Sequence, residues 1–236
     1  MGAAATYPFK EGGYTLYSCT TCPFARRAVR AFNAANVPYA VEEIDLTNKP
    51  EWYPQVNPRG LVPALRTPDG TILVESLVIA EFVAEQFPEA ELLPRDPVAR
   101  AQLRLFIDKY ATEVTPNFYR LVKSADKGEQ DALKAKLAEG FKAISAELDA
   151  QWQREAGRGG PFWAGDRWAY AEIALASFLE ALPVLEHYRG FVVPSTDEFA
   201  AFHRWNKAVQ EHPEAARAYP GRDTLIAAHK KFVPDA

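Results

Sequence analysis

Residues 14–27 read YTLYSCTTCPFARR, and this stretch decides the fold. Its first five residues include the β-branched and aromatic side chains that favour strands. From Pro23 to about residue 36, apolar side chains recur at helical spacing. Proline is favoured in the first turn of a helix because the N–H group that it lacks would have no partner there. The stretch therefore predicts a strand, a short polar loop, and a helix capped by Cys22.

The same alternation of strands and helices continues as far as residue 87. We expect, in order, a strand at 39–44, a segment rich in proline and aromatic residues at 51–56, strands at 61–66 and 71–74, and a helix at 77–87. The turn sequence TPDG joins the last two strands into an antiparallel hairpin, and Ser76 is a favourable N-cap for the helix. A right-handed crossover makes the first two strands parallel. This order, β-α-β-α-β-β-α, predicts a thioredoxin-like fold.

A proline-rich stretch separates this pattern from a second one. Residues 87–97, FPEAELLPRDP, contain three prolines and are typical of a linker. Beyond them the sequence carries helical patterns without a strand signal, at 98–124, 129–155, 169–182, 196–211 and 222–231. We therefore predict an α/β thioredoxin-like domain at residues 1–90, a linker at 91–97 and an all-helical domain at 98–236.

The composition argues against several functions. The 236 residues carry a net charge of −4 without a basic stripe, which disfavours a nucleic-acid partner. No apolar run approaches the roughly 18 residues that a membrane-spanning helix needs, and the N-terminus lacks the features of a secretory signal. Gly2 and Thr6 fit a myristoylation pattern, although an unmodified tip of small residues is the simpler interpretation. We expect a cytoplasmic protein without stable membrane association.

The two cysteines, Cys19 and Cys22, are too few for a disulfide framework, and the four histidines show no metal-ligand spacing, so we expect no metal site. At a helix start, Cys22 meets unpaired N–H groups and the positive end of the helix dipole, and Arg26 and Arg27 add positive charge. This position predicts a reactive thiolate with a pKa below the ordinary cysteine value. The alternative is an inert buried cysteine.

The role of Cys19 is left open by the sequence. In thioredoxin-type C-x-x-C motifs the first cysteine begins the helix, whereas here the second one does. Cys19 is either a resolving thiol that closes a disulfide with Cys22, or a free loop thiol without a role.

Two further segments have features of a ligand site. Pro63 opens a strand but has no N–H for the ladder, and a cis Val62–Pro63 bond would leave the backbone of Val62 free to pair with an extended peptide. Glu75 and Ser76 stand where a strand passes into a helix, an arrangement that suits the ammonium and carboxylate of a γ-glutamyl group. The alternative for this pair is an ordinary N-cap after an exposed glutamate.

Five segments resemble the omega class of glutathione transferases: CPFARR at 22–27, NKPEWY at 48–53, NPRGLVPAL at 57–65, VESLVIAEF at 74–82 and LLPRDPVARA at 92–101. The resemblance is dense from about Tyr14 to Ala101 and loose beyond. It implies a thioredoxin-like domain followed by a helical domain, glutathione as co-substrate without a metal, and a homodimer. The activity it implies is glutathione-dependent thiol transfer or reduction, including removal of glutathione from mixed disulfides and reduction of dehydroascorbate.

The resemblance also assigns residues. It makes Cys22 the catalytic nucleophile, places Phe24 beside glutathione, and implies that the backbone of Val62, before a cis Pro63, pairs with the cysteinyl part. The other implied glutathione-binding residues are Leu46, Lys49, which faces the glycyl carboxylate, and Glu75 and Ser76, which anchor the γ-glutamyl group. Read without the resemblance, Lys49 is an ordinary surface lysine. An acceptor site is expected around Phe106, Tyr110 and Glu113 and near Thr224, with no acceptor identity implied.

Two departures from the family pattern stand out. Cys19 has no expected counterpart, and the Ser or Thr and Asp of a helix-capping box are replaced by Ala169 and Glu172. We expect only the hydrogen bond to Glu172 to form. The missing side-chain cap at Ala169 should lower helix stability by about 1 kcal/mol.

Two rival functions are not enzymatic. A carrier of aromatic ligands with the same fold would use the many aromatic side chains of the helical half. Chloride intracellular channel proteins share the fold and a similar C-P-F motif, but residues 29–41, VRAFNAANVPYAV, are too short and too polar to insert into a membrane.

Overall fold

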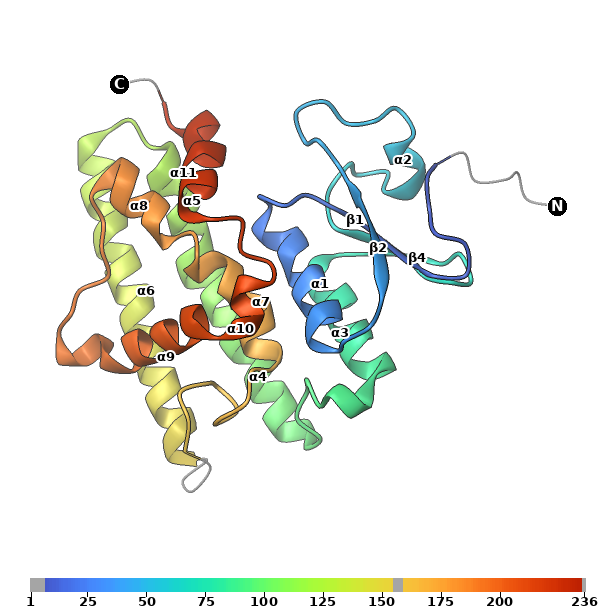
Figure 1. Ribbon diagram of the computed structural model, residues 1–236. Helices are drawn as coiled ribbons and strands as arrows, with labels where there is room; N and C mark the ends of the chain where they lie inside the picture. Colours follow the sequence, from blue (N-terminus) through green and yellow to red (C-terminus); the bar gives the residue numbers. More distant parts are fainter. Residues whose placement is uncertain (1–6, 155–158, 235–236) are drawn as a thin grey trace. The chain divides into compact units, whose positions relative to one another are not determined.

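The computed structural model in Figure 1 describes residues 7–154 and 159–234. Gly2 and Thr6, which carry the myristoylation pattern, lie outside the described residues. The same is true of residue 155, the predicted last residue of one helix.

The chain divides into two compact units, Met1–Leu92 and Leu93–Ala236. The first unit contains β1 (Tyr14–Ser18), α1 (Pro23–Ala34), β2 (Tyr39–Glu43), α2 (Tyr53–Val56), β3 (Ala64–Arg66), β4 (Ile72–Val74), α3 (Ser76–Gln86) and a 3-10 turn, η1 (Pro88–Ala90). The four strands form one sheet in the order β2-β1-β3-β4. β1 pairs with β2 in parallel, whereas β1–β3 and β3–β4 are antiparallel. The predicted thioredoxin-like arrangement is confirmed.

Alternating residues of β1 build the layers on the two faces of this sheet. The ring of Tyr14 lies 5.3 Å from that of Phe32 in α1 and 6.4 Å from that of Phe82 in α3. The ring of Tyr17 lies 6.2 Å from that of Tyr53 in α2. Accordingly, α1 and α3 pack together against one face, as Figure 1 shows, and α2 covers the other.

Two predicted boundaries in this unit are wrong, both next to the expected ligand site. The strand expected at 61–66 begins only at Ala64, because Pro63 has no N–H to donate to the ladder. The Val62–Pro63 bond is cis. Ser76 is the first residue of α3 rather than its N-cap. The cap position is held by Glu75, whose φ of 70° lies in the left-handed region.

The second unit is helical. Its elements are α4 (Pro97–Lys109), a π-helical turn η2 (Tyr110–Val114), α5 (Thr115–Lys123), α6 (Lys127–Arg154), α7 (Tyr170–Leu179), α8 (Leu182–Arg189), the 3-10 turns η3 (Asp197–Phe199) and η4 (Lys230–Phe232), α9 (Ala200–Glu211), α10 (Pro213–Ala216) and α11 (Arg222–His229). Among the described residues, no helix is long and apolar enough to cross a membrane.

The helix expected at 98–124 is interrupted in its middle. Pro116 has no N–H for the α-helical hydrogen bond to the carbonyl of Thr112, and the chain opens into the wider π turn of η2 just before it. A further helix, α8, was not predicted. It begins with Leu182 and Pro183, and a proline is compatible with the first turn of a helix.

The start of α4 offers a direct test of a helix cap. Asp96 is the N-cap residue, and its Oδ2 accepts a hydrogen bond of 2.7 Å from the N–H of Ala99. We expect Asp96→Ala to lower the free energy of unfolding by about 1 kcal/mol, because that N–H loses its partner. Asp96→Asn, which keeps an acceptor oxygen, is the matched control and should unfold close to wild type in urea. Equal midpoints for the alanine variant and wild type would contradict the assignment.

Candidate active site

Cys22 occupies the position between β1 and α1 that the sequence predicts. It is the N-cap residue of α1, with φ −82° and ψ 118°, and Pro23 follows as the first helical residue. The carbonyl of Cys22 accepts the N–H of Arg26 at 3.1 Å and starts the helical ladder. Its thiol is free and partly exposed. The chain thus presents one accessible sulfur at the positive end of a helix.

The charge balance at Cys22 corrects the sequence prediction. Burial raises the pKa of the Cys22 thiol above its ordinary value, and neighbouring Cys19 raises it further, whereas the N–H groups of Ala25 and Phe24 and the charge of Arg26 lower it. Among the described residues, the helix donates no well-formed cap hydrogen bond to the side chain of Cys22. Desolvation therefore outweighs the helix end, and in the free protein Cys22 is mostly a thiol at neutral pH.

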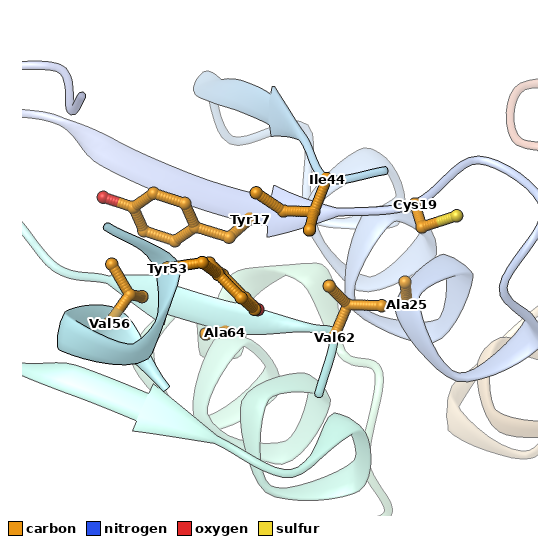
Figure 2. Packing of buried hydrophobic residues seen from close by; sticks show 8 residues of the cluster. All are labelled: Tyr17, Cys19, Ala25, Ile44, Tyr53, Val56, Val62 and Ala64. Atoms are coloured by element: carbon orange, nitrogen blue, oxygen red, sulfur yellow. The ribbon is translucent and has the colours of Figure 1, made fainter. Parts of the chain in front are cut away.

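The loop before β3 lies next to this sulfur. Val62 belongs to a buried cluster with Tyr17, Cys19 and Ile44, shown in Figure 2, and both Cys22 and Leu46 pack against that cluster. The backbone N–H and C=O of Val62 have no hydrogen-bond partner within the described part of the chain. Cys22, Leu46 and Val62 thus meet at one cluster, where neither backbone group of Val62 has a partner among the residues that the structure describes.

The shape of this loop is fixed by hydrogen bonds from α2 and its end. The carbonyl of Leu61 accepts hydrogen bonds from the hydroxyl of Tyr53 and from Nδ2 of Asn57, both at 2.7 Å. The N–H of Gly60 bonds to the carbonyl of Asn57 at 2.8 Å. Lys49 lies over Gly60: its Nζ is 3.4 Å from where a Cβ would stand. Lys49 is therefore next to the same loop, with its side chain exposed.

Glu75 and Ser76 also lie where predicted, but each already has a partner. The carboxylate of Glu75 forms an exposed ion pair with Arg59. Oγ of Ser76 accepts a hydrogen bond of 3.2 Å from Arg27, whose guanidinium also lies 5.3 Å from the ring centre of Phe24. Arg59 and the contact of Arg27 with Ser76 were not predicted, since pairing between segments leaves no local signal in the sequence.

A tyrosine or serine hydroxyl can activate glutathione by a hydrogen bond, without a cysteine. The hydroxyls near Cys22 are poorly placed for this. Tyr17 is fully buried, and its hydroxyl donates to the carbonyl of Pro8 at 2.8 Å. Burial raises the pKa of Tyr17 far above its ordinary value. Ser18 is buried as well, and burial also raises the pKa of Tyr14. Neither Tyr17 nor Ser18 therefore presents an accessible hydroxyl in this region.

The expected acceptor residues differ in their exposure to solvent. Phe106 and Tyr110 are each 1% exposed and belong to the core of the helical unit, where Phe106 packs 5.7 Å from Trp205. In this structure neither side chain presents surface to a ligand, and their role in an acceptor site stays a prediction. Glu113 is partly exposed and pairs with Lys109 at 3.2 Å, and Thr224 is exposed on α11.

Comparison with known proteins supplies the family. A family model described as the N-terminal domain of glutathione S-transferase matches residues 21–86. Glutathione S-transferase omega-1 of Mus musculus is 34% identical over 148 residues, which cover 63% of this chain and 61% of that protein. The pyrimidodiazepine synthase of Drosophila melanogaster is 33% identical over 184 residues, covering 77% of this chain and 70% of that protein.

A solved structure extends the similarity over both units. Glutathione transferase Omega 2C from Trametes versicolor superposes with a TM-score of 0.77 at 29% identity, covering 94% of this chain and 99% of that one. A thioredoxin-like unit followed by a helical unit is the glutathione transferase fold. The chain belongs to the glutathione S-transferase family, and omega-class proteins are among its most similar relatives.

Proposed function

We propose that the protein carries out glutathione-dependent thiol transfer and reduction through a mixed disulfide between Cys22 and glutathione. The observation that carries the proposal is the partly exposed thiol of Cys22 at the start of α1, packed beside the cluster that contains Val62. An omega-like sequence around this cysteine supports it. A tyrosine or serine transferase would instead need an accessible hydroxyl here.

The residues around Cys22 can hold an extended tripeptide. The unpaired N–H and C=O of Val62 would bond to the cysteinyl backbone, with Pro63 fixing their direction and Leu46 and Phe24 lining the sides. Lys49 would face the glycyl carboxylate. Oγ of Ser76 already accepts from Arg27, so its own proton is free to point at the γ-glutamyl carboxylate. Glu75 would exchange Arg59 for the γ-glutamyl ammonium.

The chemistry is two successive thiol–disulfide exchanges. The Cys22 thiolate attacks the glutathionyl sulfur of a mixed disulfide, and the substrate thiolate leaves with the electron pair and takes up a proton. A second glutathione thiolate then attacks the glutathionyl sulfur bound to Cys22, giving oxidised glutathione and free Cys22. Dehydroascorbate reduction would consume two glutathione molecules through the same intermediate.

The raised pKa of Cys22 is compatible with this role, although it leaves fewer molecules in the thiolate form. A small fraction of the thiol is ionised at neutral pH, but a more basic thiolate is also a stronger nucleophile once formed. The rate per thiolate therefore partly offsets the low population.

A panel assay tests the proposal. Wild type and Cys22→Ser are compared with hydroxyethyl disulfide, dehydroascorbate and a chloronitrobenzene, each with glutathione. We expect turnover of the first two, lowered about a hundredfold or more by the substitution, because serine cannot form the mixed disulfide. Activity on the chloronitrobenzene alone, unchanged in Cys22→Ser, would overturn the proposal in favour of conjugation. Tight aromatic-ligand binding without turnover in either protein would favour the carrier.

A further inference from the structure

The two cysteines stand at the ends of a single tight turn. The N–H of Cys22 donates to the carbonyl of Cys19 at 2.9 Å, the i to i+3 hydrogen bond of a β-turn over residues 19–22. In such a turn the first and last Cα atoms are within about 7 Å of each other. Disulfides span Cα separations of roughly 4.4–6.8 Å. The turn therefore keeps the Cα atoms of Cys19 and Cys22 close to the range of separations that a disulfide spans.

This turn is anchored on β2. The N–H and the hydroxyl of Thr20 donate to the two carboxylate oxygens of Glu43, at 2.7 and 3.2 Å. The N–H of Ile44 donates to the carbonyl of Ser18 at 2.7 Å, just before the turn. Because both the turn and its entry are tied to the neighbouring strand, the two cysteines are held in position rather than presented on a free loop.

The two sulfurs differ in their access to solvent. Cys19 is 8% exposed, and its Sγ lies 3.5 Å from the hydroxyl of Thr21, whereas Cys22 is partly exposed. Figure 2 shows Cys19 at the end of β1, with its sulfur directed away from Ile44. The two thiols are close enough for Cys19 to raise the pKa of Cys22. Of the two thiols, Cys22 is therefore the more accessible to a disulfide in solution, and Cys19 is the buried neighbour.

We infer that Cys19 is a resolving thiol, which converts the Cys22–glutathione mixed disulfide into an intramolecular Cys19–Cys22 disulfide. This inference rests on the proposed function. The Cys19 thiol loses its proton, and its sulfur attacks Sγ of Cys22. The bond between Cys22 and glutathione breaks, and the glutathione sulfur leaves with the electron pair and takes up a proton. Oxidised glutathione is the only oxidant required, because the exchange itself moves the disulfide without further oxidation.

The intramolecular disulfide removes the nucleophile from the active site reversibly. A glutathione thiolate that attacks Sγ of Cys22 restores the mixed disulfide and frees Cys19, and a second glutathione releases Cys22. The state of the pair thus follows the ratio of reduced to oxidised glutathione. When most of the glutathione is oxidised, the enzyme is converted to the inactive Cys19–Cys22 disulfide. Reduced glutathione then restores the free thiol of Cys22.

The test mixes reduced protein with oxidised glutathione and measures the mass of the protein over time by mass spectrometry. Wild type should pass through one added glutathionyl group to a product lacking two hydrogens, with a Cys19–Cys22 cross-linked peptide. In Cys19→Ser and Cys19→Ala the glutathionyl adduct should persist at least about tenfold longer, because no neighbouring thiol can displace it.

The outcomes separate this inference from the function on which it rests. An adduct that forms on Cys22 of wild type and lasts as long as in both Cys19 variants would overturn the resolving role and leave the proposed function intact. Failure of Cys22 to accept glutathione in any of the proteins would overturn both. Agreement between the serine and alanine variants excludes a folding defect peculiar to one of them.

Discussion

Replacing Glu172 with alanine is expected to lower the free energy of unfolding by about 4 kcal/mol, roughly a thousandfold in the folding equilibrium. Glu172 is fully buried at the start of α7. Its Oε1 accepts the N–H of Trp163 at 3.0 Å and Nε1 of Trp205 at 2.9 Å. Its Oε2 accepts the N–H of Ala169 at 3.2 Å, which confirms the one surviving half of the predicted capping box.

The size of this effect follows from what the alanine variant leaves behind. Three buried donors lose their acceptor, and each unsatisfied group costs about 1–3 kcal/mol. The removed side chain also leaves a cavity beside Trp205, which is itself fully buried. Urea unfolding of the purified variant measures the loss. A midpoint equal to that of wild type would contradict the role assigned to this carboxylate.

Glu172→Gln is the matched control and also reports the ionisation of the carboxyl group. Burial raises the pKa of Glu172, against the N–H groups of Trp163, Trp205, Ala169 and Glu172 itself, which lower it. A raised native pKa means that the native state binds the proton more tightly than the unfolded chain does. Its contribution to stability is complete below the ordinary glutamate value and is lost as pH rises through the native pKa. The advantage of wild type over Glu172→Gln should therefore shrink as pH rises above the ordinary glutamate pKa.

The parts of the fold that the sequence predicts well depend on neighbouring residues. The strand, loop and helix around Cys22 follow from β-rich residues, a proline at the first helical position and helical spacing, all within one stretch. The TPDG turn is equally local: the N–H of Gly70 bonds to the carbonyl of Thr67 at 2.9 Å. The π turn was missed because the loss of one hydrogen bond at Pro116 redirects the chain without changing its apolar periodicity.

Site residues were harder to predict, because their state depends on segments distant in the sequence. Helical periodicity marks Phe106 and Tyr110 as inward-facing, but it cannot separate a core position from a pocket wall. The pairing of Glu75 with Arg59 depends on where two loops meet. The pKa of Cys22 depends on packing against a cluster drawn from β1, α2 and the cis-proline loop, and burial there raises it.

Alkylation of Cys22 in the free protein is expected to accelerate about tenfold per pH unit, and about a hundredfold between pH 6 and pH 8. Only the thiolate reacts, so the rate follows the ionised fraction until pH reaches the pKa. Because burial raises that pKa above the ordinary cysteine value, the rate should still be rising at pH 9. The measurement uses iodoacetamide and the Cys19→Ser variant, in which Cys22 is the one remaining cysteine.

The same variant unfolded in urea provides the control, since its exposed thiol titrates near the ordinary value of about 8.5. Its rate should level off at lower pH than that of the folded protein, and the displacement between the two curves measures the net effect of the fold on the thiol. A folded-state rate that is already constant below pH 7 would reverse the sign of that displacement. The N–H groups of Phe24 and Ala25 and the charge of Arg26 would then outweigh burial, and Cys22 would be a standing thiolate, as the local sequence alone predicts.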